Sequence, residues 1–354
     1  MTIEQFGWNT TWHQEFLPWE EKGFIPGRVT IEHKRMYRVQ TNDGEYLCEL
    51  SGKFRYMTSE RHEFPAVGDW VIVQALPKEK KGFIQGILPR RSQFIRKVAG
   101  EETTGQVIAA NIDTIFLVMA LTNDFNVRRL ERYLVLAWES GANPVIILTK
   151  ADLCSNVETY VEKVHSVALG VPVHPISCYE GTGLDELSAY LQVGKTIALV
   201  GSSGVGKSTL MNYWLKEEYQ AVQEVRQNDN KGRHTTTNRV LFHLPEGACV
   251  IDTPGMRELS LWESNEGLDE TFEDIIQLAQ YCHFNDCQHN TEPKCAVRNA
   301  IENGSLSPHR LESYRKLQKE LAYVARKENE RLQHNSKRRW KAISKEMRQY
   351  KKRY

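Results

Sequence analysis

The stretch "ALVGSSGVGKSTL", Ala198 to Leu210, decides how the rest of the chain is interpreted. A short apolar run enters a glycine-rich loop, which ends in Lys207 and Ser208 and leads into a run with helical character. The loop fits the pattern G-x-x-x-x-G-K-[ST], in which backbone N–H groups curl around phosphates at a helix N-terminus. Lysine in this pattern reaches the β- and γ-phosphates, and the hydroxyl that follows it is a Mg²⁺ ligand. The expected nucleotide-binding residues here are Gly201, Ser202, Ser203, Gly204, Val205, Gly206, Lys207, Ser208 and Thr209, with Ser208 also at the metal.

The segment "VIDTPGM" supplies a second nucleotide-binding element. Asp252 stands at the end of an apolar strand, where its carboxylate can hold the Mg²⁺ shell, and the Gly255 amide can contact a γ-phosphate. The pattern D-x-x-G also marks many ordinary turns. Its position one expected strand away from the phosphate loop favours the nucleotide interpretation.

The segment "LTKADL" indicates which base is bound. Thr149, Lys150, Ala151 and Asp152 follow a strand and resemble the guanine-reading N-K-x-D element, with Thr in place of the commoner Asn. The Asp152 carboxylate can accept hydrogen bonds from guanine N1 and the exocyclic amine, while the Lys150 stem covers the ring. Adenine lacks that donor pair and would leave the carboxylate unpaired. We therefore expect GTP or GDP, bound with Mg²⁺.

A loop in "ISCYEGTGL" completes the expected base site. Ser177 and Cys178 lie where a backbone supports the guanine O6, with Cys where Ala is more usual. Base reader and base support thus precede the phosphate loop, whereas ordinary GTPases begin with the phosphate loop. This order predicts a circularly permuted domain, which is tolerable because the termini of compact domains are often close together.

The sequence around these elements predicts a doubly wound α/β domain over residues 105–262. "IDTIFLVMAL" and "NPVIILT" are near-continuous apolar runs, as parallel strands buried on both faces should be. Between them, "VRRLERYLVLAWES" has the apolar spacing of a helix. The fold class is therefore α/β, with a P-loop GTPase domain at its centre.

The sequence of residues 27–98 predicts a small β-barrel. Five short alternating runs, "GRVTIE", "MYRVQT", "EYLCEL", "DWVIVQA" and "GFIQGIL", predict strands, and "TNDGE" predicts a hairpin turn. Five strands in so short a segment suit an OB-fold, which often binds oligonucleotides. The alternative is a small structural β-domain. Residues 1–26 form an aromatic-rich N-terminal extension to which the sequence assigns no role.

Residues 263–354 begin with a cysteine–histidine cluster. Cys282, Cys287, His289 and Cys295 give C-x₄-C-x-H-x₅-C, and three thiolates with one imidazole satisfy a closed tetrahedral zinc site. Four protein ligands favour one structural Zn²⁺, because catalytic zinc keeps a position for water. His283 competes with His289 but adjoins Cys282, so it is less suited to share an ion with it.

The distribution of charge is uneven although the net charge is +1. Residues 308–354 carry 16 Lys and Arg against 5 Glu, and they include Trp340 and Tyr350. Such a basic helical tail suits phosphate contacts and stacking on RNA, while the alternative is a solvated charged helix. Seven cysteines without an export signal, and no long apolar run, favour a cytoplasmic protein with no membrane partner. Nothing demands more than a monomer.

Taken together, "TKAD", "GSSGVGKST", "GRHTTT", "DTPGMRE" and "CHFNDCQHNTEPKC" resemble the circularly permuted, ribosome small-subunit-dependent GTPase A family. The resemblance runs from about residue 27 to the C-terminus and implies an OB barrel, a permuted GTPase domain and a zinc module. It also implies that residues 232–237 are the first switch, where Thr235, Thr236 or Thr237 completes the Mg²⁺ and γ-phosphate contacts, with Thr236 and Thr237 favoured. The acidic, aromatic N-terminus departs from the basic leader common in the family, so contacts of that leader are not transferred.

The residue that follows the D-x-x-G element affects the expected rate of GTP hydrolysis. Met256 replaces the usual glutamine, and a thioether cannot orient water. His234 is the candidate for that role, with Arg233 as a charge stabiliser; the alternative is a solvent-facing loop histidine. Intrinsic hydrolysis should be slow, at or below roughly 10⁻⁴ s⁻¹, so an activator is expected.

The resemblance implies that this activator is the small ribosomal subunit with its rRNA, and that hydrolysis serves as a checkpoint in late subunit maturation. The alternative is an RNA-binding module that responds to guanine nucleotide with little turnover. An ATP-using P-loop enzyme is a third possibility, which Asp152 disfavours.

Overall fold

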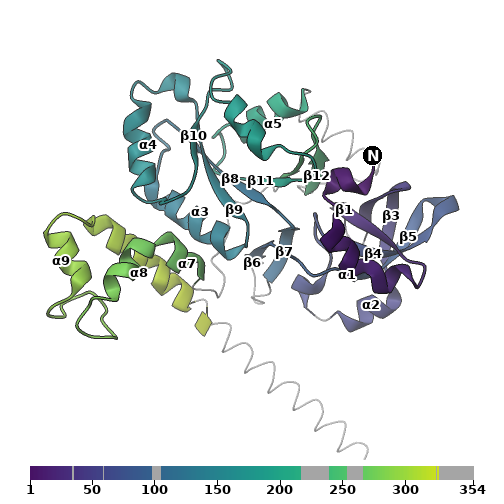
Figure 1. The fold of residues 1–354 in the computed structure, drawn as a ribbon, viewed down its shortest axis with the longest axis horizontal. Coiled ribbons are helices and arrows are strands. Elements are labelled where there is room, and N and C mark those ends of the chain that lie inside the picture. The colour runs from purple at the N-terminus through teal and green to yellow at the C-terminus, as the bar shows by residue number, and fades with distance from the viewer. Residues whose placement is uncertain are drawn as a thin grey trace, which may run out of the picture. The chain divides into compact units, whose positions relative to one another are not determined.

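The computed structural model describes residues 1–33, 36–58, 60–97, 105–216, 239–252, 266–323 and 325–326 (Figure 1). The chain divides into two compact units, Met1–Ser260 and Leu261–Tyr354. The first unit is built on one sheet that contains both the strands of the barrel and those around the phosphate loop.

A five-stranded barrel forms one part of the first unit. Its strands are β1 (Ile25–His33), β2 (Met36–Thr41), β3 (Gly44–Leu50), β4 (Trp70–Leu76) and β5 (Lys81–Ile87). They pair in the order β1-β2-β3-β5-β4, and β4 pairs with β1 to close the barrel. Closure leaves no free edge, and the interior is filled by apolar side chains such as Val29, Val39 and Tyr46. The expected OB-type barrel is confirmed, with the short helix α2 (Gly52–Met57) after β3.

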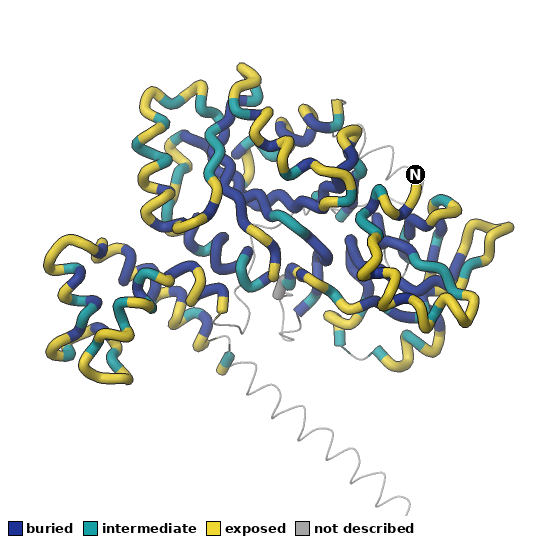
Figure 2. The backbone as a smooth tube through the Cα atoms, viewed as in Figure 1, coloured by how far each residue is buried: buried dark blue, intermediate teal, exposed yellow. Residues whose placement is uncertain are grey.

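The other part of this unit is a mainly parallel sheet. Its strands are β8 (Thr114–Ala120), β9 (Asn143–Thr149), β10 (Val173–Pro175), β11 (Thr196–Val200), β12 (Val240–His243) and β13 (Cys249–Asp252). Strands β10-β9-β8-β11-β13 run parallel, and β12 is antiparallel to β13. Most residues of these strands are buried, those of β10 being half-buried, which explains the continuous apolar runs of β8, β9 and β11 (Figure 2).

Helices cover this sheet on its faces. Helix α5 (Lys207–Leu215) buries Leu210, Met211 and Trp214 in the core with Phe116 and Leu199, while α3 (Val127–Glu139) packs on β8 and β9. Helix α4 (Val157–His165) packs against β10. The predicted doubly wound α/β domain is confirmed.

The sheet continues from the α/β part into the barrel. Val240 of β12 lies opposite Ile31 of β1, and the side chains of Arg239 and Glu32 form an ion pair of 3.4 Å next to it. A separate two-stranded sheet of β6 (Gln93–Lys97) and β7 (Gly105–Ala110) lies between the barrel and β8 in the sequence. The hydrogen-bonded continuity was not expected from the sequence.

The N-terminal extension packs against both parts of the first unit. Its elements are η1 (Ile3–Phe6) and α1 (Thr10–Glu20), and it buries Ile3, Phe6, Trp12 and Phe16. The rings of Phe6 and His243, which ends β12, lie 5.3 Å apart. A Cβ atom built on Gly7 would lie 2.5 Å from the carbonyl oxygen of Gly194. The extension is therefore a structural part of this unit.

The second unit consists, where it is described, of short helices and the turn-rich loop of residues 282–295. It contains α7 (Glu266–Thr271), α8 (Glu273–Ala279), α9 (Ala296–Glu302) and helical residues 308–323. Arg310 is buried, stacks on Phe272 and bonds Asp274 at 3.0 Å, which fixes the last helix to α8. Within the described part of the chain, no helix is both long and apolar enough to cross a membrane.

Candidate nucleotide site and metal centre

The phosphate loop connects the end of β11 to the start of α5. Gly204 and Gly206 have φ values of 77° and 100°, which favour glycine. A Cβ atom on Gly201 would lie 2.3 Å from the carbonyl oxygen of Val118, so this position also requires glycine. The ammonium group of Lys207 donates to the carbonyl oxygens of Gly201 and Ser202, each at 2.7 Å. The predicted loop residues therefore form one compact turn with the lysine folded over it.

The base-reading segment lies at the end of β9. Lys150 has a φ of 61° and leads into η4 (Ala151–Leu153), where Asp152 is exposed. The backbone N–H of Ala151 donates to the carbonyl of Ile176 at 3.1 Å, which joins this segment to the predicted base-support loop.

The base-support loop is close to the base-reading carboxylate. Ser177 is buried, and its N–H donates to the carbonyl of Thr182 at 3.0 Å. Burial raises the pKa of the Cys178 thiol, and the negative charge of Asp152 raises it further, which requires the two side chains to be near each other. The structure therefore brings together the two segments that were expected to hold guanine.

The hydroxyl of Thr149 links the base-reading segment to the phosphate loop. This side chain is buried, and its Oγ1 lies 2.5 Å from the carbonyl oxygen of Val205 and 3.2 Å from that of Met119. A hydroxyl has one proton, so the shorter contact to Val205 takes the hydrogen bond. The threonine at the first position of T-K-A-D thus ties together two segments that are 56 residues apart in sequence.

Replacing Thr149 by valine is expected to weaken GDP binding by about tenfold, or about 1.4 kcal/mol. Valine keeps the shape but leaves the buried Val205 carbonyl without its donor, which loosens the loop that holds the phosphates. Isothermal titration calorimetry of the purified variant measures the effect. Thr149→Ser, which retains the hydroxyl, is the control and should bind nearly as the parent does; equal losses in both variants would contradict this role.

Asp124 is a functional candidate that sequence reasoning missed. Its carboxylate accepts a hydrogen bond from the Ser202 hydroxyl at 2.8 Å and pairs with Arg129 at 2.8 Å. These two donors lower the pKa of the Asp124 carboxyl, so it is ionised at neutral pH. The sequence feature that could have identified Asp124 is the polar run directly after the buried strand β8. Residues in such a position lie near the phosphate loop, because the carboxyl ends of parallel strands meet at one edge of the sheet.

The magnesium-binding candidates lie at this same edge. Ser208 is exposed in the first turn of α5. Asp252 ends β13, and its neighbour Ile251 lies opposite Ala198 of β11 in parallel register. The other predicted residues of this group, His234, Thr236, Gly255 and Met256, lie outside the described residues.

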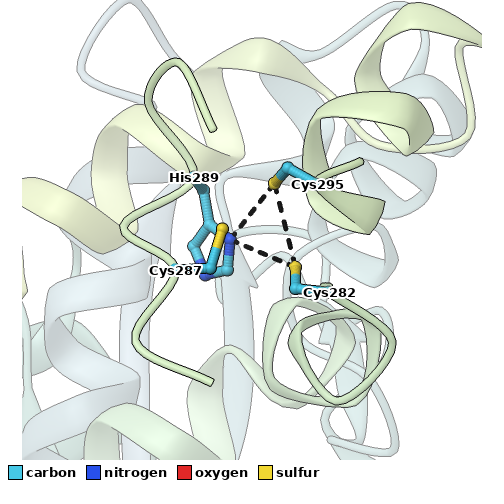
Figure 3. Close-up of side chains that lie close together, drawn as sticks. All are labelled: Cys282, Cys287, His289 and Cys295. Atoms are coloured by element: carbon cyan, nitrogen blue, oxygen red, sulfur yellow. Dashed lines mark hydrogen bonds between the residues drawn. The ribbon is translucent and has the colours of Figure 1, made fainter. Parts of the chain in front are cut away.

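Four side chains of the second unit converge on one point (Figure 3). The ligand atoms of Cys282, Cys287, His289 and Cys295 all lie within 4.8 Å of one another. The Nδ1 atom of His289 is 3.6 Å from the sulfur of Cys282 and 3.4 Å from that of Cys295, and these two sulfurs are 3.8 Å apart. The ligands of a tetrahedral zinc ion with bonds of ~2.3 Å would be ~3.7 Å apart. The donor set and its spacing therefore fit a four-coordinate metal ion.

The surrounding chain holds these ligands in place. The sulfur of Cys295 caps α9 by accepting the N–H of Arg298 at 3.5 Å, and the guanidinium of Arg315 donates to the carbonyl of His289. Burial lowers the pKa of His289, and the charge of Arg315 adds to this effect, so the imidazole is neutral as a metal ligand must be. His283 is outside the cluster and stacks edge-on against Phe284.

Fold and site together define a circularly permuted P-loop GTPase that carries an OB-type barrel and a Cys₃His metal-binding module. A family model described as RsgA GTPase matches residues 87–262, and one described as 50S ribosome-binding GTPase matches residues 196–332. The chain belongs to the RsgA GTPase family, which confirms the resemblance drawn from its motifs.

Individual relatives match over most of the chain. The small ribosomal subunit biogenesis GTPase RsgA 2 of Lactiplantibacillus plantarum is 51% identical over 304 residues, covering 86% of this chain and 85% of the relative. The corresponding RsgA of Opitutus terrae is 43% identical over 352 residues, with 97% and 96% covered. Among solved structures, YjeQ from Thermotoga maritima matches with a TM-score of 0.62 at 29% identity, covering 84% of this chain and 99% of YjeQ. YloQ, described as a circularly permuted GTPase, matches with a TM-score of 0.61 at 28% identity, covering 84% and 95%.

Proposed function

We propose that this protein is a GTP hydrolase stimulated by the small ribosomal subunit, and that it acts as a checkpoint in late maturation of that subunit. The observation that carries the proposal is the meeting of the base-reading segment and the phosphate loop through the hydroxyl of Thr149. The names of its relatives, which are small ribosomal subunit biogenesis GTPases, support the ribosomal part.

We assign roles to the described residues from their motifs, and their positions support these assignments. Asp152 accepts the two guanine N–H donors, and Lys207 leaves the loop carbonyls to contact the β- and γ-phosphates. Ser208 and Asp252 would hold the Mg²⁺ that accompanies GTP, and this ion would neutralise charge on the phosphates. Asp124 keeps Ser202 of the phosphate loop in one orientation.

The remaining roles rest on residues outside the described part. We assign the orientation of the attacking water to His234, because Met256 cannot perform it, and completion of the Mg²⁺ and phosphate contacts to Thr236, with the Gly255 amide at the γ-phosphate. His234 and Thr236 both lie in the segment that the resemblance identifies as the first switch.

We further propose that the ion in the Cys₃His cluster is a single structural Zn²⁺, and that the basic tail contacts rRNA. Three thiolates with one imidazole are donors that zinc prefers, and the four ligands leave no position for a reacting water. The tail supplies 16 Lys and Arg for phosphate contacts. The protein would work as a monomer in the cytoplasm.

Turnover of GTP is expected to be slow for the protein alone and to rise by about a hundredfold or more with purified small subunits, since an external activator supplies what the chain lacks. His234→Ala should remove most of the stimulated rate while GDP affinity stays the same. Phosphate release in single-turnover assays measures both. His165→Ala, at an exposed position on α4, is the control.

Absence of stimulation in the unaltered protein would contradict the proposal and favour an RNA-binding module that responds to guanine nucleotide with little turnover. A salt series adds a second readout. Stimulation should fall steeply as salt rises, because contacts between a basic tail and RNA release counterions.

A further inference from the structure

A polar cavity of about 240 Å³ lies where the N-terminal extension, the barrel and the parallel sheet meet. Three tryptophans line it, together with three basic side chains; these six are Trp8, Trp12, Trp70, Arg28, Arg91 and Lys195. It opens at the amino end of β11, whereas the phosphate loop follows the carboxyl end of the same strand. The cavity is therefore separate from the nucleotide site.

A buried guanidinium faces this cavity. Arg28 donates to the carbonyl oxygens of Gly68 at 3.2 Å, Asn111 at 3.0 Å and Phe6. Among the described residues, no carboxylate lies within ion-pairing distance of it. Five N–H groups with three such bonds leave two N–H groups to donate. Asp69 and Asp113 attract this buried charge only from beyond ion-pairing distance, so its burial is costly, and an anion in the cavity would offset that cost.

Thr196, which lines the same cavity, carries an unpaired hydroxyl. Thr196 is fully buried, and its Oγ1 has no hydrogen-bond partner among the residues that the structure describes. Its backbone N–H, by contrast, donates to a carboxylate oxygen of Asp113 at 2.8 Å. Buried hydroxyls are nearly always paired, so a polar ligand in the cavity is the simplest partner for this one.

The remaining charges leave the cavity positive. Arg91 is exposed and lies 4.0 Å from the ring of Trp12, and Lys195 pairs with Asp113 at 3.2 Å. Glu4 and Asp113 are the acidic groups of the lining, and both oxygens of Asp113 already accept hydrogen bonds, from Lys195 and Thr196. Three basic groups against two acidic ones give one net positive charge.

We propose that this cavity binds a small oxyanion, of the phosphate or carboxylate type, as a second ligand of the protein. Arg28, Arg91 and the Thr196 hydroxyl would hold the oxyanion, and the tryptophan rings would pack against the body that carries it. A volume of 240 Å³ suits a compact metabolite rather than a second nucleotide. Because the ligand would touch the extension, the barrel and the start of β11 at once, it would stabilise their junction.

The test uses the full chain saturated with GDP, so that the phosphate loop cannot bind the probe. Inorganic phosphate and malonate are titrated separately by calorimetry and by thermal unfolding, with chloride at the same ionic strength as reference. We expect saturable binding and a higher Tm with at least one oxyanion, and the comparison of the two distinguishes phosphate from carboxylate recognition. Arg91→Gln should weaken binding by about tenfold. Arg298→Gln, which removes a surface arginine paired with Glu302 in the second unit, should not.

Thr196→Val gives an independent readout. It removes an unpaired buried hydroxyl, so the oxyanion-free Tm should rise while oxyanion affinity falls. Absence of saturable binding beyond that of chloride would overturn the proposal, as would equal affinities of the Arg91→Gln and Arg298→Gln variants. If Thr196→Val fails to fold, the comparison of the Arg91→Gln and Arg298→Gln variants alone tests the proposal.

Discussion

Exchanging Asp152 for asparagine is expected to lower the affinity for GDP by about a hundredfold or more, and to raise the affinity for xanthosine diphosphate. Guanine presents two N–H donors to the carboxylate. An amide offers one acceptor and one donor, so its NH₂ group would face the exocyclic amine of guanine. Xanthine has a carbonyl oxygen at that position, which accepts a hydrogen bond from the NH₂ group of asparagine.

Calorimetry with both nucleotides measures this exchange of specificity. Glu180→Gln is the control, since it removes an exposed carboxylate from the neighbouring base-support loop without touching the base reader. A variant that loses affinity for both nucleotides alike would show that Asp152 supports the fold of the loop rather than reading the base. Unchanged GDP affinity would remove Asp152 from the site.

Removing one ligand of the Cys₃His cluster is expected to have the second large effect. Cys295→Ser should release the metal and unfold the loop of residues 282–295, because a structural zinc ion contributes on the order of 10 kcal/mol of folding free energy. Cys295 also caps α9, so the loss should extend into that helix. Metal content, measured by plasma mass spectrometry, should fall from one equivalent to near zero, and limited proteolysis should cut within the second unit.

Cys154→Ser is the matched control, because Cys154 is a half-buried free thiol outside the cluster and should keep the full metal content. A chelator of high affinity should reproduce the Cys295→Ser digest in the unaltered protein. Retention of a full equivalent of zinc by Cys295→Ser would contradict the four-ligand site. Finding iron or no metal in the native protein would contradict zinc.

Features encoded by short stretches of sequence could be predicted. The phosphate loop has its glycines, Lys207 and Ser208 within eight residues, and the four metal ligands span fourteen. The apolar runs of β8 and β9 are long because both faces of those strands are buried. In such cases the local pattern already contains the physical constraint.

Features that depend on distant contacts could not be predicted. Asp124 bonds Ser202 across 78 residues of sequence, and Arg28 reaches Asn111 across 83. The role of the N-terminal extension is of the same kind: aromatic composition predicts burial but not the surface against which a ring packs. The Thr149 hydroxyl is an intermediate case, because its motif marked the position but its partner, Val205, followed only from the fold.

The sheet that continues through the first unit has a mechanical consequence. Asp252 lies opposite Val240, and Val240 lies opposite Ile31, so two steps of strand pairing lead from the candidate magnesium ligand Asp252 to a wall of the barrel. Because β1 also closes that barrel through β4, a displacement of Asp252 passed along this path would act on a strand that is paired on both sides within the barrel. A shift of Asp252 that depends on the bound nucleotide would thereby be transmitted to the barrel as strain in the paired strands.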